Sequence, residues 1–503
     1  MKRDESLQAL AERQQWDVLV IGGGASGLGA AVDSAARGYR TVLLEQHDFA
    51  KATSSRSTKL IHGGVRYLKQ GNLSLVLESL RERGRLLRNA PHLVHPLSFI
   101  VPAHSAWEKI YYGIGLKLYD RLSGDWSLGH SQIISREQTF QHLPTIAREK
   151  FCGGVLYFDG QFDDARLAIV LAQTLADLGG APLNYAHVSR LLKTNGHISG
   201  VVAQDLENGR EFEVAARVVI NATGVFTDEV RRLDDATAPP LITASRGAHI
   251  VVDRSFLPGK SALMVPKTTD GRVLFAIPWH EHVVIGTTDS ATNDLSLEPR
   301  ATTDEIEFLI GNASRYLERA PTKRDIRSTF AGLRPLVKSS ARSTAKLSRD
   351  HTIVISPSGL VTLTGGKWTT YRKMGEDAID HALKPGGLET RPAATATMKL
   401  HDDSDSAELE QWVTTEPALG APLHSRLSYR GVEVRRAVRR EMARTVEDVL
   451  ARRTRALFLD AQAAIEMAPQ VAAMMRTELG RGGNWECEQV VAFTKLARGY
   501  LVG

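Results

Sequence analysis

Residues 17–45 read DVLVIGGGASGLGAAVDSAARGYRTVLLE and contain, in order, every part of a dinucleotide-binding βαβ unit. The apolar run from Val18 to Ile21 is typical of a strand that is buried on both faces. Gly22, Gly24 and Gly27 follow it at the G-x-G-x-x-G spacing, which permits a tight turn, close approach of the backbone to a pyrophosphate and close packing of the next helix. The stretch therefore predicts a dinucleotide site at the N-terminus of a helix.

A second apolar run, Thr41 to Leu44, ends at Glu45. A carboxylate at this place in the fold accepts hydrogen bonds from a ribose 2′-hydroxyl and repels a 2′-phosphate, which disfavours NADP. The pattern alone does not distinguish FAD from NAD.

Length and composition narrow the class of protein. A chain of 503 residues exceeds the size of one hydrophobic core, so about two to four domains are expected. The two cysteines, Cys152 and Cys487, have no metal-ligand spacing, so we expect neither a disulfide nor a metal site. The net charge of +6 is compatible with phosphorylated substrates or anionic lipid, whereas no motif supports nucleic-acid binding.

The N-terminus, MKRDESLQALAERQQ, is charged and lacks the apolar segment of a signal peptide, which favours a cytoplasmic location. No apolar run approaches the length of a membrane span, so any membrane contact is expected to be peripheral. Residues 107–122, WEKIYYGIGLKLYDRL, mix aromatic and basic side chains as a helix at a lipid headgroup layer does. A buried core contact or a homodimer contact is the alternative for this helix.

Several later segments have the pattern of a cofactor-binding α/β protein. The polar loop 52–64 is expected to touch a polar ligand, and the strand from Arg217 ends in small and polar residues of the kind that line a cofactor. Residues 247–288 contain several β-forming segments and predict an antiparallel sheet. A last buried strand, Val361 to Thr364, precedes Gly-Gly-Lys and a helix from about Tyr371, and residues 405–503 are mostly helical in pattern.

Taken together, these segments resemble the FAD-dependent, quinone-linked glycerol-3-phosphate dehydrogenase family along nearly the whole chain. The resemblance is carried by IGGGASGLGAAVDSAARG from Ile21, TSSRSTKLIHGGVRYL from Thr53, FDGQFDDARL from Phe158, VINATGVF from Val219, SRGAHIVV from Ser245, AGLRPL from Ala331, TGGKWTTYRKM from Thr364 and VEDVLARRTRALFLD from Val446.

The resemblance implies an α/β fold with a Rossmann-like FAD-binding domain, an antiparallel-sheet substrate (cap) domain and a C-terminal helical domain. We predict a discontinuous FAD-binding domain of residues 14–66, 150–235 and 351–386. The cap domain is expected at 67–149 and 236–350, and the helical domain at 387–503.

The resemblance also implies an activity. This family oxidises sn-glycerol 3-phosphate to dihydroxyacetone phosphate by hydride transfer from substrate C2 to FAD, and passes the electrons to a membrane quinone. A glycerol-3-phosphate oxidase that uses oxygen and a related FAD-dependent amine oxidase are the alternatives. An amine oxidase would not need cations that bind phosphate.

Four residues are the expected catalytic set. Arg334 is the first choice for the substrate phosphate because a guanidinium matches phosphate oxygens and stays charged. Lys367 adds a positive charge beside substrate or flavin. His62 and His249 are the candidate bases, and His62 is preferred because the resemblance places its loop along the flavin.

Arg66 and Tyr67 are expected to position substrate or to brace their loop. The resemblance assigns FAD contacts to several other short segments. The predicted FAD-binding residues are Gly22, Gly24, Gly27, Glu45, Thr53, Ser54, Ser55, Lys59, Ala222, Gly224, Gly365 and Lys367. Arg56 and Trp368 depart from the family pattern, and we favour variation without functional effect for both.

Overall fold

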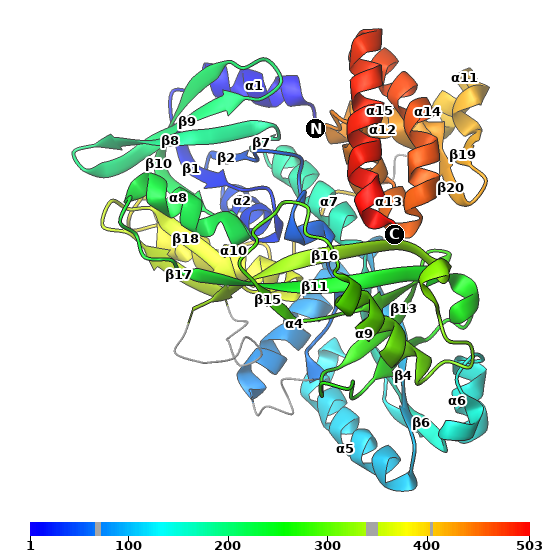
Figure 1. Cartoon of the computed structure of the whole chain (residues 1–503). Coiled ribbons are helices and arrows are strands. Elements are labelled where there is room, and N and C mark those ends of the chain that lie inside the picture. Colours follow the sequence, from blue (N-terminus) through cyan, green and yellow to red (C-terminus); the bar gives the residue numbers. More distant parts are fainter. Residues whose placement is uncertain (66–71, 339–350, 403–405, 503) are drawn as a thin grey trace.

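The computed structural model describes residues 1–65, 72–338, 351–402 and 406–502. Three parts of the chain are visible in Figure 1: a sheet with flanking helices, a second and larger sheet, and a helical C-terminal region. The expected α/β fold with two sheet-based domains and a C-terminal helical domain is confirmed. Arg66 and Tyr67 lie outside the described residues.

The first sheet, here called the cofactor sheet, contains the βαβ unit that the sequence predicts. Its parallel centre has the strand order β18-β10-β1-β2-β7, with β17 antiparallel at one edge and the β8–β9 hairpin attached to β10. The strands are β1 (Trp16–Ile21), β2 (Thr41–Leu44), β7 (Ala181–Leu183), β8 (Ala186–Thr194), β9 (His197–Asp205), β10 (Glu211–Asn221), β17 (His351–Ile355) and β18 (Val361–Gly365). β1 is buried at every position because both faces of the sheet are covered.

Helices cover this sheet and bring their N-termini to its carboxyl edge. The helices are α1 (Arg3–Glu12), α2 (Ala25–Ala36), α7 (Asp164–Asp177), α8 (Thr227–Asp234) and α10 (Tyr371–Ala382). α2 and α10 cross closely: a Cβ atom on Gly375 would lie 2.3 Å from the carbonyl oxygen of Gly29. Both helices therefore begin at one place, beside the ends of β1 and β18.

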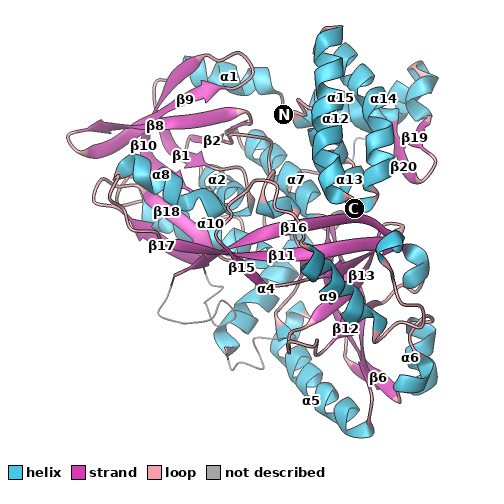
Figure 2. Cartoon of the chain, viewed as in Figure 1, coloured by secondary structure: helices cyan, strands magenta, loops and turns pink. Residues whose placement is uncertain are grey.

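The second sheet, here called the cap sheet, is mostly antiparallel (Figure 2). Its order is β15-β11-β14-β13-β12-β4-β6-β3, with β16 on β11 and β5 on β6. The strands are β3 (Leu60–Ile61), β4 (Val94–Ala103), β5 (Gln132–Ile134), β6 (Gly153–Phe162), β11 (Ile242–Asp253), β12 (Ala262–Val265), β13 (Leu274–Trp279), β14 (His282–Gly286), β15 (Ser290–Thr292) and β16 (Ile326–Val337). Its helices are α4 (Leu73–Asn89), α5 (Ala106–Ser123), α6 (Arg136–His142) and α9 (Thr303–Ser314).

Two predicted domain boundaries differ from the structure. β6 was assigned to the FAD-binding domain from residue 150, but it pairs with β4 along its whole length in the cap sheet. Leu388 and Leu400, assigned to the C-terminal domain, pack into the core of the cofactor sheet. Both differences depend on contacts between residues that are far apart in the sequence, which a local sequence pattern does not reveal.

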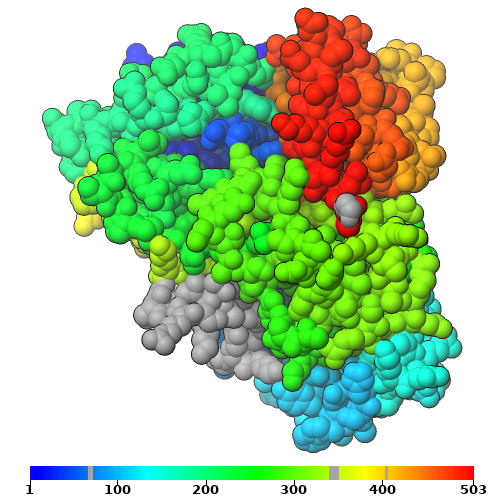
Figure 3. All heavy atoms as spheres, in the orientation of Figure 1, coloured from blue at the N-terminus to red at the C-terminus, as the bar shows by residue number. Residues whose placement is uncertain are grey.

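The C-terminal region consists of a helical bundle and one short hairpin. Its elements are α11 (Ser406–Thr415), β19 (Pro422–His424), β20 (Leu427–Arg430), α12 (Gly431–Glu441), a π-helical segment (Asp448–Arg453), α13 (Ala456–Leu459), α14 (Ala461–Leu479) and α15 (Gly483–Ala497). Its apolar core continues into the cap sheet through Trp279 and Phe330. Figure 3 shows the red C-terminal helices in direct contact with the green segments of that sheet. Among the described helices, none is long and apolar enough to cross a bilayer.

Candidate active site

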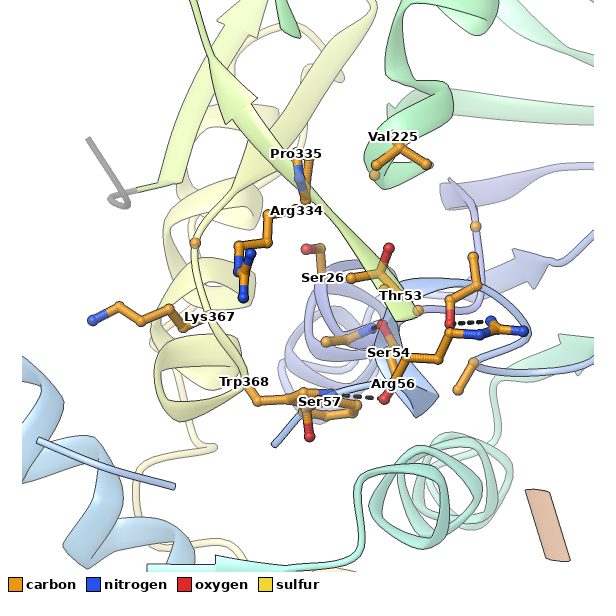
Figure 4. Close-up of a pocket in the computed structure, with 18 of the residues that line it drawn as sticks. Ser26, Thr53, Ser54, Arg56, Ser57, Val225, Arg334, Pro335, Lys367 and Trp368 are labelled. Carbon is orange, nitrogen blue, oxygen red and sulfur yellow. Dashed lines mark hydrogen bonds between the residues drawn. The ribbon is translucent and has the colours of Figure 1, made fainter. Parts of the chain in front are cut away.

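A cavity of about 700 Å³ lies between the cofactor sheet and the cap sheet. Its lining comes from the glycine-rich turn, the loop after β2, the segments after β10 and β18, and strands β11 and β16. Figure 4 shows Thr53 and Ser54 on one side of this space and Arg334 on another. Segments far apart in sequence thus form one site.

The glycine-rich turn is shaped as its sequence predicts. Gly22 has a φ of 109°, which favours glycine, and a Cβ atom on Gly27 would lie 1.9 Å from the carbonyl oxygen of Gly22. Gly22 and Gly24 line the cavity, whereas Gly27 packs α2 on the turn. The amide of Ala25 donates to Ser54 Oγ at 2.9 Å, so a hydroxyl lies at the helix N-terminus where a phosphate binds. This cradle fits a dinucleotide pyrophosphate.

Glu45 lies at the end of β2 and lines the cavity, as expected. Its carboxylate accepts hydrogen bonds from the amides of Gly23 (2.6 Å) and His47 (2.8 Å). Burial raises the pKa of Glu45 above that of an exposed carboxyl, although the two amides oppose this rise. Glu45 therefore holds the glycine-rich turn in place, and its contact with a ribose stays a prediction.

The polar loop after β2 divides into residues that line the cavity and residues that anchor the loop. Thr53 and Ser54 line the cavity. Ser55 and Lys59 are fully buried outside its lining, so their direct contact with FAD stays a prediction. Lys59 Nζ donates to both carboxylate oxygens of Asp164, at 2.7 and 2.8 Å, because a buried ammonium group requires a charged partner.

The segments after β10 and β18 complete the cofactor side. Ala222, Gly224, Gly365 and Lys367 all line the cavity, so the structure brings these predicted residues together. Lys367 points away from Arg334 in Figure 4 and donates to Ser79 Oγ of α4 at 3.2 Å.

The two departures from the family pattern also lie in the cavity wall. Trp368 Nε1 donates to the carbonyl oxygen of Ser54 at 2.9 Å and so connects the segment after β18 to the polar loop after β2. Arg56 Nη2 donates to Glu298 at 2.7 Å and to Tyr500 at 3.2 Å. Burial opposes the charge of Arg56, but Glu298 and Tyr500 outweigh it and raise the pKa of the guanidinium. Trp368 and Arg56 therefore each form hydrogen bonds with other parts of the protein.

The opposite wall is the face of the β11–β16 pair. His249 and Gly247 lie on this face of β11, and Gly332 and Arg334 lie on the same face of β16, because alternate residues of a strand share a face. Gly247 is paired with Gly332, and the missing side chains let the guanidinium of Arg334 lie over Gly247 and let Arg56 approach Gly332. A Cβ atom on Gly247 would lie 2.3 Å from Arg334 Nη2. The sequence analysis did not identify this glycine pair. Its signal in the sequence is a glycine two positions before His249 and another two positions before Arg334.

Arg334 is held by oxygen atoms around it. Its guanidinium donates to Thr287 Oγ1 and the carbonyl oxygen of Thr288, both at 3.1 Å, and lies 3.3 Å from Asp289 Oδ1. These contacts orient the planar group at the cavity wall. The sequence analysis assigned no role to Thr287 or Asp289, because both are more than 40 positions from Arg334 in the chain.

The two candidate bases both line the cavity. His249 Nε2 lies 3.0 Å from Thr58 Oγ1, its ring stacks on Phe330, and among the described residues no group hydrogen-bonds its Nδ1. Burial, together with the positive charges of Lys59 and Arg334, holds the pKa of His249 well below the usual range. His249 is therefore a neutral imidazole at pH 7. His62 is less buried, and its backbone bonds Thr369 Oγ1.

Comparison with known proteins agrees with this geometry. Residues 17–372 match the family model described as FAD dependent oxidoreductase, and residues 404–488 match the C-terminal domain of alpha-glycerophosphate oxidase. The mitochondrial glycerol-3-phosphate dehydrogenase of Rattus norvegicus is 37% identical over 99% of this chain and 76% of its own length. The Arabidopsis thaliana enzyme SDP6 is 38% identical over 95% of this chain and 85% of its own length.

A solved structure extends this similarity to three dimensions. The glycerol-3-phosphate dehydrogenase of Bacillus halodurans, complexed with FAD, superposes with a TM-score of 0.79 at 27% identity and covers 99% of this chain and 98% of its own. Sequence and fold therefore agree over the full length, and the chain belongs to the family of FAD-dependent glycerol-3-phosphate dehydrogenases.

Proposed function

We propose that this protein oxidises sn-glycerol 3-phosphate to dihydroxyacetone phosphate and passes the electrons to a membrane quinone. FAD, when bound, supplies the hydride acceptor. The observation that carries the proposal is the common face of β11 and β16, where the cation of Arg334 and the neutral imidazole of His249 both line the cavity.

Each of these two side chains suits one part of this substrate. Arg334 offers a fork of N–H donors, oriented by Thr287, to the phosphate. His249 accepts the proton of the C2 hydroxyl as the hydride leaves, because its imidazole is uncharged at neutral pH. The sequence analysis preferred His62 for this role. The common strand face favours His249, and the choice between them stays a prediction.

An anaerobic absorbance experiment tests the reaction. Glycerol 3-phosphate is expected to bleach the flavin band of the purified holoenzyme. Arg334→Met should raise the substrate concentration for half-bleaching about 100-fold, because a charged hydrogen-bond pair is lost. His249→Gln should slow bleaching by about 100-fold or more, and His62→Gln should slow it far less.

The alternatives predict different results. Failure of glycerol 3-phosphate to bleach the flavin would remove the proposed substrate. Unchanged half-bleaching in Arg334→Met would remove the phosphate site, and equal effects of the two histidine variants would remove the choice of base. When oxygen and a quinone are both supplied, stoichiometric peroxide would indicate an oxidase in place of a quinone-linked dehydrogenase.

The quinone acceptor and a peripheral position on the inner face of the cytoplasmic membrane belong to the same proposal. They are supported by an apolar stripe on α5, which lies at the edge of the molecule in Figure 1. The exposed apolar side chains are Trp107, Ile110, Tyr111, Ile114 and Leu118, at the spacing of one helix face. Trp107 and Ile114 are 72% and 65% exposed, and such a stripe suits burial in a headgroup layer.

The opposite face of α5 lies directly behind the cavity. Leu116 and Tyr112 pack in one apolar cluster with Tyr157, Met264 and Phe275, and the last three line the cavity. Among the described residues, this apolar cluster joins α5 to the cavity lining. Its position supports the proposal that a lipid-soluble acceptor reaches the site from the side of α5.

Two basic residues add charge to the stripe. Lys117 and Arg121 are exposed at the C-terminal end of α5 and suit anionic lipid. Lys109, grouped with them by the sequence, instead points toward β6, because its Nζ donates to the carbonyl oxygen of Cys152 at 3.4 Å.

Vesicle sedimentation tests the membrane contact. Trp107→Ser/Ile114→Ser should reduce binding of the holoenzyme to phosphatidylglycerol vesicles about tenfold or more, because two large apolar groups no longer enter the bilayer. Val491→Ser is the matched control, since Val491 is 69% exposed on α15 in the C-terminal region. Unchanged binding of the double variant would contradict the proposal. Loss of a dimer in the double variant would assign the stripe to a homodimer instead.

A further inference from the structure

Charged side chains of the C-terminal region hold the loop that forms one cavity wall. We call residues 48–59 the cofactor loop. Asp48 at its start is fully buried and accepts hydrogen bonds from Arg452 and Arg453, two residues of the π-helical segment. A carboxylate that is removed from water requires such partners, so this end of the loop depends on the C-terminal region.

The other end of the loop is held by a second buried cluster. Asp164, at the start of α7, accepts hydrogen bonds from Lys59 Nζ (2.7 Å), the amide of Ser57 (2.9 Å) and Arg455 Nη2 (3.1 Å). The carbonyl oxygen of Ser55 accepts from Arg455 Nη2 at 2.7 Å and from Lys59 Nζ at 2.8 Å. Arg455 is the one member of this cluster that comes from the C-terminal region.

The anchored residues alternate with residues that face the cavity. Ser54 and Thr58 line the cavity on either side of the anchored carbonyl of Ser55. Ser54 Oγ accepts from the amide at the start of α2, and Thr58 Oγ1 bonds His249. A shift of the anchored backbone would therefore displace both the helix N-terminus contact and the histidine contact.

We infer that Arg455 is a positioning residue for FAD: its guanidinium fixes the cofactor loop from the C-terminal region without touching the cavity. Arg455 is absent from the cavity lining, and it is 2% exposed. The inference depends on FAD as cofactor and is independent of the proposed substrate and acceptor.

The backbone of Arg455 supports a specific role for its side chain. Its φ of 65° lies in the left-handed region, where glycine or asparagine costs less than arginine. A strained arginine that bonds the carbonyl oxygen of Ala451 and the cofactor loop is held there by those bonds. Asparagine would relieve the backbone and remove the guanidinium.

Arg455→Asn in the holoenzyme tests the inference. The fraction of molecules with a competent loop should fall, and apparent FAD affinity falls with that fraction. We expect FAD release into cofactor-free buffer, followed by flavin fluorescence, to be about tenfold faster or more. Hydrogen exchange should accelerate at residues 53–59 and stay unchanged in α14.

Arg435→Asn is the matched control. Arg435 bonds Glu416 and Glu478, both at 2.6 Å, within the C-terminal region, and among the described residues it has no hydrogen bond or ion pair with the cofactor loop. If Arg455→Asn releases FAD at the wild-type rate, or if the two variants change this rate equally, the inference is overturned. If Arg455→Asn does not fold, Arg455→Lys replaces it. A single ammonium cannot serve both Ser55 and Asp164 with the same fork, so FAD release should still rise, and an unchanged rate would overturn the inference.

Discussion

His47 shows how one side chain at the cofactor end of the cavity makes stability depend on pH. Its amide holds Glu45, and its ring lines the cavity beside Lys51. Burial, followed by the charge of Lys51, lowers the pKa of His47 to about 4 from 6.5. The folded chain therefore binds fewer protons than the unfolded chain between these two values, and stability falls as the pH drops through this window.

We expect His47→Gln to reduce this acid sensitivity, because glutamine does not titrate. At pH 5 the unfolded chain protonates His47 whereas the folded chain does not, which should lower the unfolding free energy of the wild-type protein by about 1–2 kcal/mol relative to pH 7.5. Urea unfolding at both pH values measures the difference. His197→Gln, at the exposed start of β9, is the control. An identical pH difference in His47→Gln and wild type would contradict the assignment.

At the scale of elements, the crossing of α2 and α10 sets the distance between two cavity walls. Gly29 and Gly375 face each other, and their missing side chains let the helix backbones approach. α2 begins at the glycine-rich turn, and α10 follows Lys367 and Trp368. The same contact therefore packs the core and places the two cofactor segments.

Gly375→Ala should push the helices apart, because the new Cβ atom would meet backbone rather than a flexible side chain. We expect a loss of about 1–3 kcal/mol in the free energy of urea unfolding. Gly115→Ala on α5 is the control, since nothing lies within 4 Å of its added Cβ atom, and it should stabilise its helix by up to about 1 kcal/mol. Equal stability of Gly375→Ala and wild type would show that the two helices can separate without cost.

At the scale of the whole molecule, the cavity depends on parts that lie at opposite ends. The C-terminal region anchors the cofactor loop through Arg455, whereas α5 lies behind the apolar wall near Phe275. The cap sheet connects the two, because its Trp279 and Phe330 pack in the C-terminal core. The anchor of the cofactor loop and the side from which we propose that the electron acceptor arrives thus lie on different sides of the cap sheet.

Elements with strong local patterns could be predicted from the sequence. The βαβ unit, α5, β18 and α10 all appear close to their expected residues, because apolar periodicity and glycine spacing act within a few turns of chain. Lys59 could not be placed in this way. A lysine in a polar loop has the same local pattern whether it binds a ligand or Asp164, and only the packing of α7 against the loop decides.

The sequence by itself determined the dinucleotide turn, the α/β class and the family, because each depends on residue types at short, fixed spacings. Only the tertiary structure decided that β11 and β16 place His249 and Arg334 on one wall of the cavity, and that Arg455 supports the cofactor loop. These contacts join residues that are tens to hundreds of positions apart. Their formation depends on strand register and buried charge pairing, which local periodicity does not specify.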